Sequence, residues 1–188
     1  MAFSTFDLGD GPDAQAKALQ KIAELISKGV YEPAIVRAAR AITRDCDARD
    51  DACELEAIYD AVKNGTDRVP GLENGLRYVA DPRTVDWYQS AVATLRECVA
   101  GACAADCDDH CILVASLAGA IGFKVGARAW GPNPRVKNFE HVYAVVASPK
   151  RGPWKPNGIL GMDTTVEKAH VGWQPPKGAV LTYWIEGA

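Results

Sequence analysis

Three residues in the second half of the chain, Cys107, His141 and Asp163, have the types and the order needed for nucleophilic catalysis. Cys107 stands at the expected start of a buried helix, where unsatisfied N–H groups and the helix dipole lower the pKa of a thiol. A lowered pKa matters because the thiolate is the attacking species. His141 begins an expected strand and is the candidate base, and Asp163, at the end of the next strand, would fix its tautomer. The sequence therefore predicts a Cys–His–Asp triad.

Acidic residues surround the candidate nucleophile, because Asp106, Asp108 and Asp109 all flank Cys107. Carboxylates close to sulfur would raise the pKa of the thiol and oppose its ionisation. We therefore expect a thiolate at Cys107 to need a counter-charge, which the imidazolium of His141 would supply.

Each of these residues also has an ordinary structural interpretation. A cysteine on an apolar helix is commonly a small core residue, and Cys111, one turn after Cys107, is expected to be one. His110 is expected on the helix surface or at an interface, and His170, in a loop, is the reserve base. Asp163, followed by threonine, could instead be a turn residue that bonds its own backbone.

The hydrophobic periodicity predicts helices first and strands later. The helices are expected over 13–28, 33–42, 53–63, 85–96 and 106–122, and the strands over 76–79, 124–130, 141–147, 159–162 and 180–185. This order predicts an α+β fold with helices packed on a small antiparallel sheet. We expect residues 1–50 to form an N-terminal helical extension and residues 51–188 to form one compact catalytic domain.

Three segments together carry a resemblance to a known family: DCDDH at 106–110, EHVY at 140–143 and MDTT at 162–165. They resemble the transglutaminase-like superfamily of papain-type cysteine enzymes. In that family a cysteine opens a central helix, a histidine lies on a later strand and an aspartate ends the following strand. The resemblance covers about residues 55–166, and it implies a papain-like core with Cys107, His141 and Asp163 as the triad.

The upstream words RYVADP at 77–82 and VD at 85–86 are similar to phage- and prophage-encoded members of that family. Two features depart from its pattern. Ala105 stands where the family often has glycine, and the segment CVAGAC at 98–103 lies unusually close to the nucleophile. The family's oxyanion is usually held by an upstream side chain and by the nucleophile's own N–H, which makes Trp87 or Gln89 candidate donors here.

The reaction implied is attack of the Cys107 thiolate on an amide carbonyl, with His141 protonating the leaving amine. Hydrolysis is favoured over protein crosslinking, because the chain shows neither a lysine-acceptor site nor a calcium loop. Peptide or peptidoglycan substrates are expected, with no cofactor and no metal. The alternatives are a crosslinking acyl transferase and a non-enzymatic phage tail or virion assembly component, whose extra cysteines would hold a metal or cluster.

Composition narrows the partners. With 188 residues, a net charge of -3 and a pI near 5.6, the chain lacks the basic excess that nucleic-acid binding needs. The longest apolar run, 111–123, is too short to cross a membrane, and the start of the chain does not resemble a secretory signal. We expect a virion location in a phage tail, with tail proteins as partners, or otherwise a cytoplasmic one.

The six cysteines allow several interpretations. Cys46 and Cys53 are expected to be small buried side chains, or a disulfide if the protein works outside the cell. The set Cys98, Cys103, Cys107 and Cys111 could bind a metal, although structural zinc sites usually show tighter spacing.

Overall fold

The computed structural model describes residues 4–5, 12–80, 87–136, 138–150, 152–155 and 158–186. Its helices are α1 (Pro12–Gly29), α2 (Pro33–Ile42), α3 (Asp51–Lys63), α4 (Ala91–Val99) and α5 (Cys107–Ala120). Its main sheet consists of β5 (Val125–Gly131), β6 (His141–Ala147), β7 (Ile159–Met162) and β8 (Ala179–Trp184). Four two-residue strands form two small pairs: β1 (Ser4–Thr5) with β3 (Trp87–Tyr88), and β2 (Arg77–Tyr78) with β4 (Ala104–Ala105).

The main sheet is antiparallel throughout, with the strand order β7-β6-β5-β8. β6 pairs with β5 along its whole length, from Trp130 opposite His141 to Val125 opposite Val146. β7 covers only the second half of β6, because its last paired residue, Met162, lies opposite Ala144. The first residues of β6 therefore have no strand partner on the β7 side among the described residues, and this side is called the free edge of β6.

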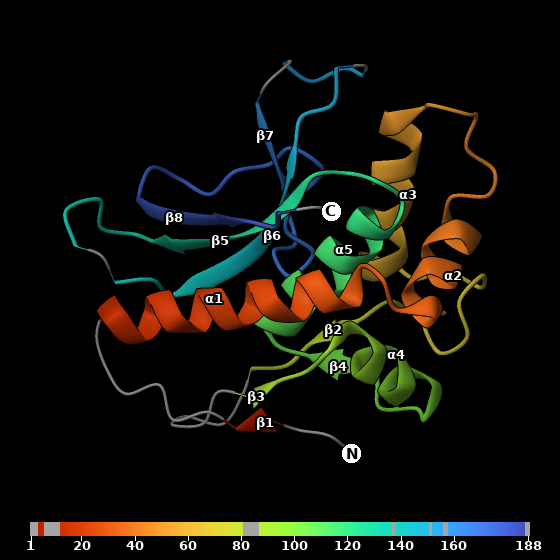
Figure 1. Cartoon of the computed structure of the whole chain (residues 1–188), viewed down its shortest axis with the longest axis horizontal. Coiled ribbons are helices and arrows are strands. Elements are labelled where there is room, and N and C mark those ends of the chain that lie inside the picture. The colour runs from red at the N-terminus through yellow and green to blue at the C-terminus, as the bar shows by residue number, and fades with distance from the viewer. Residues whose placement is uncertain are drawn as a thin grey trace.

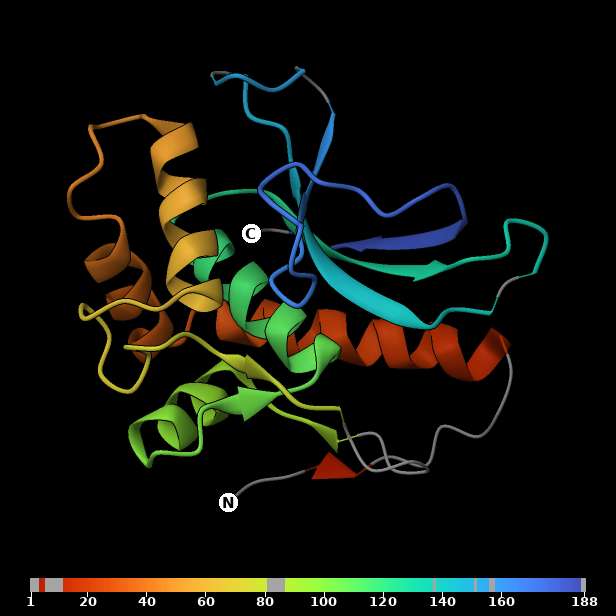
Figure 2. The same ribbon diagram turned by 180° about the vertical axis from the view of Figure 1, so that it is seen from behind.

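Helix α5 lies at the centre of the molecule and packs against β6, β5 and all four other helices (Figure 1). After its polar first turn the helix is almost entirely apolar, and its residues are buried from Asp108 to Gly119, as expected of a helix that is enclosed on every side. Viewed from behind, α5 lies between the main sheet and the layer of α4 and the β2–β4 pair (Figure 2).

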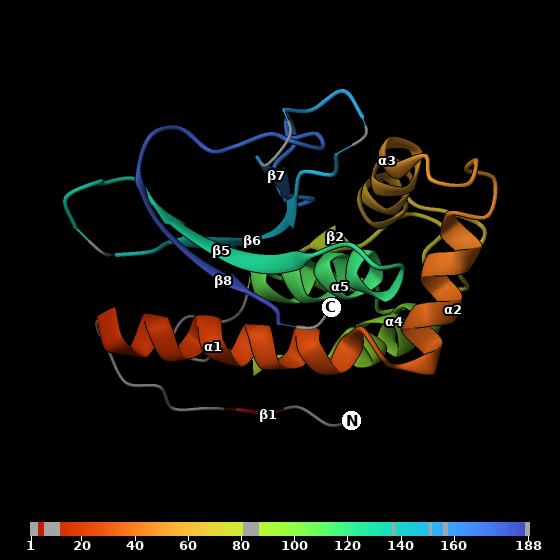
Figure 3. The same cartoon turned by 45° about the horizontal axis from the view of Figure 1, so that its top comes forward.

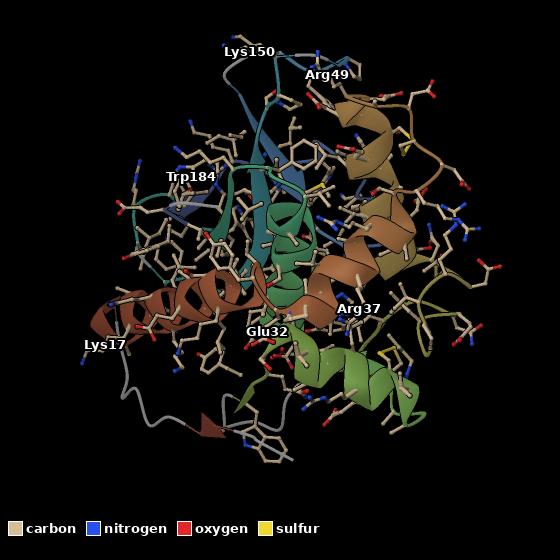
Figure 4. All side chains as sticks on the ribbon, turned by 45° about the vertical axis from the view of Figure 1, so that its right-hand side comes forward. Lys17, Glu32, Arg37, Arg49, Lys150 and Trp184 are labelled. Atoms are coloured by element: carbon tan, nitrogen blue, oxygen red, sulfur yellow. A yellow bond between two sulfur atoms is a disulfide. The ribbon has the colours of Figure 1, made fainter. Side chains whose placement is uncertain are left out.

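Helix α1 packs across α5 and lies beneath β5 and β8, which curve above it (Figure 3). Leu19, Ile22 and Ile26 recur at helical spacing and are almost fully buried. Lys17 lies on the opposite face and points to solvent (Figure 4). The amphipathic pattern thus explains both the helix and the face that it buries.

All four upstream cysteines pair, giving the disulfides Cys46–Cys53 and Cys98–Cys103. The first links the residues just before α3 to its first turn, and the second closes the turn between α4 and β4. The interpretation of 98–111 as a four-cysteine metal site is therefore wrong, because two of its sulfurs are bonded to each other. Cys107 and Cys111 keep free thiols.

The architecture of a small antiparallel sheet with packed helices confirms the α+β prediction at that level. The helix expected over 85–96 begins later, at Ala91, because the hydroxyl of Ser90 accepts a hydrogen bond from the N–H of Ala93 and caps it. Residues 81–86 lie outside the described part of the chain. None of the helices in the described ranges is long and apolar enough to span a bilayer.

Candidate active site

Cys107 is the first residue of α5, and local interactions fix this helix start. Asp106 is the N-cap, and its Oδ1 accepts a hydrogen bond from the N–H of Asp109 at 3.3 Å. Upstream, β4 pairs in parallel with β2, and the Cys98–Cys103 disulfide closes the turn before β4. The backbone therefore enters α5 along a fixed path.

The thiol of Cys107 lies beside the free edge of β6, where the backbone N–H of Val142 donates a hydrogen bond to the sulfur. Val142 directly follows His141 in the chain. The sulfur of Cys107 therefore contacts the residue next to the candidate base. Cys107 and His141 both line one cleft of about 290 Å³. Among the described residues no hydrogen bond joins the sulfur to the ring of His141, and catalytic contacts of this kind often tighten only with substrate.

His141 and Asp163 are in direct contact, with 2.7 Å between Nε2 and Oδ2. Asp163 directly follows β7 and is 1% exposed, so the carboxylate reaches the ring from inside the protein. When Nε2 carries the proton that it donates to Asp163, Nδ1 is the basic nitrogen of the neutral ring. The ring of Tyr143 stacks on that of His141, with centroids 5.9 Å apart, which further restricts its rotation.

Asp163 also makes the turn contacts that its sequence context suggests. Its Oδ1 accepts hydrogen bonds from the N–H of Thr165 at 3.0 Å and from the hydroxyl of Thr165 at 2.7 Å. The two interpretations of this residue are thus compatible, because each uses a different oxygen. Burial by itself would raise the pKa of Asp163, but the bonds and charge of His141 together with the bonds from Thr165 outweigh it and lower the pKa.

The pKa of Cys107 contradicts the expected lowering at the helix start. Burial raises it to about 12, the charges of Asp106 and Asp108 add to the rise, and the N–H of Val142 opposes it only in part. The resting state is therefore a thiol and not a thiolate. Desolvation and two nearby carboxyl groups favour the neutral sulfur, and together they outweigh the stabilisation of a thiolate by the helix dipole.

Asp106 and Asp108 are the carboxyl residues on either side of Cys107. Burial raises the pKa of Asp108 far above the usual value for a carboxyl group, and the hydrogen bond and charge of Asp106 add to the rise. Ligand atoms of Asp106, Cys107 and Asp108 all lie within 4.8 Å of one another, and within the described ranges this is the one group that could contact a single cation. Acidic groups of this kind are common without an ion.

His110 is buried, with 2% of its surface exposed, which corrects the expectation of a surface residue. The reason is that α5 is enclosed on all sides and has no solvent face. Its Nδ1 lies 2.9 Å from the hydroxyl of Thr164, which ties α5 to the residue after Asp163. Burial lowers the pKa of His110 to about 4, so the ring is neutral at physiological pH.

The other candidates lie elsewhere. His170 lines a separate cavity beside Tyr59 and Asp60. The side-chain amide of Gln89 donates to Glu97 at 3.4 Å, and neither Gln89 nor Trp87 lines the cleft. Cys111 is 2% exposed and belongs to the core, as expected.

Sequence reasoning missed the contribution of α1 to this site. Four residues of α1 line the cleft, namely Gln15, Ala18, Leu19 and Ile22. Tyr88, which precedes α5 in the chain, also lines it. The amphipathic stripe of α1 indicated burial but carried no signal of what it would be packed against.

Comparison with known proteins adds no relative: no protein-family model, no curated protein and no solved structure matches the chain. The assignment of a function to this site therefore depends on its own residues and geometry.

Proposed function

We propose that the protein is a cysteine-dependent amide hydrolase of the transglutaminase-like type, with Cys107 as nucleophile, His141 as base and Asp163 as the residue that orients the base. The observation that carries the proposal is the 2.7 Å contact of His141 with a buried carboxylate, in the same cleft as a cysteine at a helix start. A buried aspartate that accepts from a histidine on a cleft wall is an arrangement that activates a nucleophile.

The resting thiol defines how the first step must proceed. Because Cys107 is protonated, Nδ1 of His141 removes the proton as the sulfur attacks the carbonyl carbon. The C–N bond then breaks, the amine leaves with the proton from the imidazolium, and an acyl-cysteine remains. Water, activated by the neutral ring, hydrolyses this thioester and restores the thiol.

Asp163 supports the charge that forms on the ring during this cycle. Its lowered pKa keeps it ionised at neutral pH, so it stabilises the imidazolium of His141 without taking up the proton. Its two bonds from Thr165 hold the carboxylate in place while His141 changes charge.

The two disulfides favour action in an oxidising environment, since such bonds are rare in the cytosol of most organisms. This supports a protein that works outside the cytoplasm, such as a phage tail or virion component. Peptide bonds of the bacterial cell wall or of a virion protein are the substrates that such a location offers.

A second candidate function is a non-enzymatic assembly component that keeps this fold. The observation favouring it is the high pKa of Cys107, which leaves very little thiolate at neutral pH. A crosslinking acyl transferase would share the acyl-cysteine and differ only in using an amine in place of water.

The proposal is tested by incubating the protein with purified peptidoglycan and with casein, and by measuring the release of soluble fragments. We expect release by the wild type and by Cys111→Ala, and none by Cys107→Ala or after alkylation. Incorporation of a fluorescent amine into casein would identify the acyl transferase. The absence of both activities in folded wild-type protein would favour the assembly component.

A further inference from the structure

The cleft at Cys107 has an apolar wall on each side. Helix α1 supplies one wall, and β5, β6 and the segment before β6 supply the other. The apolar lining residues are Ala18, Leu19, Ile22, Tyr88, Ala129, Phe139 and Val142. A cleft of about 290 Å³ lies at the lower end of ligand-site volumes, so it has room for one side chain beside the reacting amide and not for a large group.

Apart from His141, the charged side chains that line the same cleft are acidic. Asp106, Asp108 and Glu140 contribute carboxyl groups, and none of the described residues that line it is lysine or arginine. Carboxylate oxygens of Asp106 and Asp108 lie within 4.8 Å of the sulfur of Cys107, and Glu140 is exposed directly before β6. A substrate carboxylate would meet repulsion from these groups, and His141, whose ring already contacts Asp163, is the one basic side chain among the described residues of the lining.

The second wall is held in place by α1. The side-chain amide of Gln15 donates to the carbonyl of Phe139 at 2.9 Å, and its Oε1 accepts from the N–H of Phe139 at 3.1 Å. The same amide donates to Asn138 at 3.2 Å. A Cβ at Gly131 would collide with the carbonyl of Asn138, so glycine is needed for this close return of the chain. Phe139 and Glu140 are therefore fixed relative to α1 before substrate arrives.

We infer that this cleft selects an amide whose acyl side carries an apolar side chain and whose neighbouring groups are neutral or cationic, and that it rejects one with a carboxylate beside the scissile bond. The inference rests on the proposed function, since it names the substrate class of that site. Between the two substrates considered above, it favours an apolar stretch of a protein chain over the acidic peptides of the cell wall.

The test measures covalent labelling of Cys107, so it needs no turnover. In a Cys111→Ala background, the rate of labelling at Cys107 is followed by peptide mass spectrometry with neutral iodoacetamide and anionic iodoacetate, and with phenylalanyl and glycyl chloromethyl ketones. Free glutathione treated in parallel gives the intrinsic reactivity of each reagent.

Relative to glutathione, we expect the iodoacetate-to-iodoacetamide ratio to fall about tenfold, the size of effect that one nearby charge produces in a partly exposed site. We expect the phenylalanyl reagent to exceed the glycyl one by about tenfold or more, from burial of the ring. Glu140→Gln should raise the iodoacetate-to-iodoacetamide ratio. Phe139→Ala should lower the preference for the phenylalanyl over the glycyl reagent. Glu32→Gln, an exposed acid that does not line the cleft, is the matched control and should change neither.

The outcomes separate the two proposals. If Cys107 labels readily but its iodoacetate-to-iodoacetamide and phenylalanyl-to-glycyl ratios equal those of glutathione, the inferred substrate class is wrong. The proposal that Cys107 is the nucleophile is then unaffected. If no reagent labels Cys107 in the folded protein even at about pH 11, where thiolate forms, although all label it after denaturation, the cleft is not accessible and both proposals fail.

Discussion

Replacing Asp106 by asparagine should make the thiol of Cys107 more acidic. Ligand atoms of the two residues lie within 4.8 Å. Two unit charges at that distance interact by about 0.9 kcal/mol in water and by about 3.5 kcal/mol at an effective dielectric constant of about 20. These limits correspond to about a fivefold and about a few-hundredfold increase in the thiolate fraction at a given pH. Asparagine can still cap α5, because its Oδ1 can accept the N–H of Asp109.

The single replacement Asp106→Asn is expected to lower the pKa of Cys107 by only part of this amount. Asp108 owes its raised pKa first to burial and then to its bond with Asp106, so losing that partner favours ionisation of Asp108. A carboxylate at Asp108 would replace part of the removed charge. The double variant Asp106→Asn/Asp108→Asn should therefore have the largest effect on the pKa of Cys107.

The assay is the rate of iodoacetamide alkylation at Cys107 between pH 6 and pH 11, which reports the thiolate fraction. We expect the pH profile to shift to lower pH in the single variant and further in the double variant, with Glu32→Gln unchanged. Circular dichroism confirms that α5 and the fold are retained. If the profiles of all variants coincide with that of the wild type, burial alone sets the pKa and the electrostatic explanation is refuted.

Three further perturbations test the surroundings of the site. Asp163→Asn should lower hydrolysis about a hundredfold or more at neutral pH by weakening general-base catalysis, and unchanged activity would make Asp163 only a turn residue. Because its folded pKa lies below the unfolded value, the stabilisation from this carboxylate should be present above about pH 4 and be lost on acidification, so urea unfolding of wild type and variant should converge below that pH. Gln15→Glu keeps the acceptor and loses the donor of the α1 contact, so it should raise KM; a KM equal to that of the wild type would show that the wall needs no support. Cys98→Ser/Cys103→Ser should lower the free energy of unfolding by about 2 kcal/mol, from the chain entropy of a short loop, and reductant should have no further effect on that turn.

The parts of this site that follow from local rules were predictable. Asp106 caps α5 where an aspartate precedes an apolar run, and the thiol of Cys107 falls in the first turn as a consequence. His141 and Asp163 meet because one begins a strand and the other directly follows its antiparallel neighbour, which places both at the same end of the two strands.

What depends on three-dimensional burial was not predictable in the same way. The helix dipole indicated an acidic thiol at Cys107, but desolvation reverses the sign, and desolvation is known only once the packing is known. His110 looked like a surface residue because periodicity gives one exposed face by default, whereas α5 has none. The cysteine pairs likewise require distances that spacing does not supply.

The central claim, that Cys107 forms an acyl intermediate with the help of His141, is tested most directly by trapping that intermediate. The protein is mixed with p-nitrophenyl phenylacetate, the burst of p-nitrophenolate is recorded, and the acylated residue is located by peptide mass spectrometry after acid quench. We predict a burst approaching one equivalent with the acyl group on Cys107, a much slower burst in His141→Ala, and none in Cys107→Ala. Acylation of another residue, or a burst that persists in Cys107→Ala, would contradict the account.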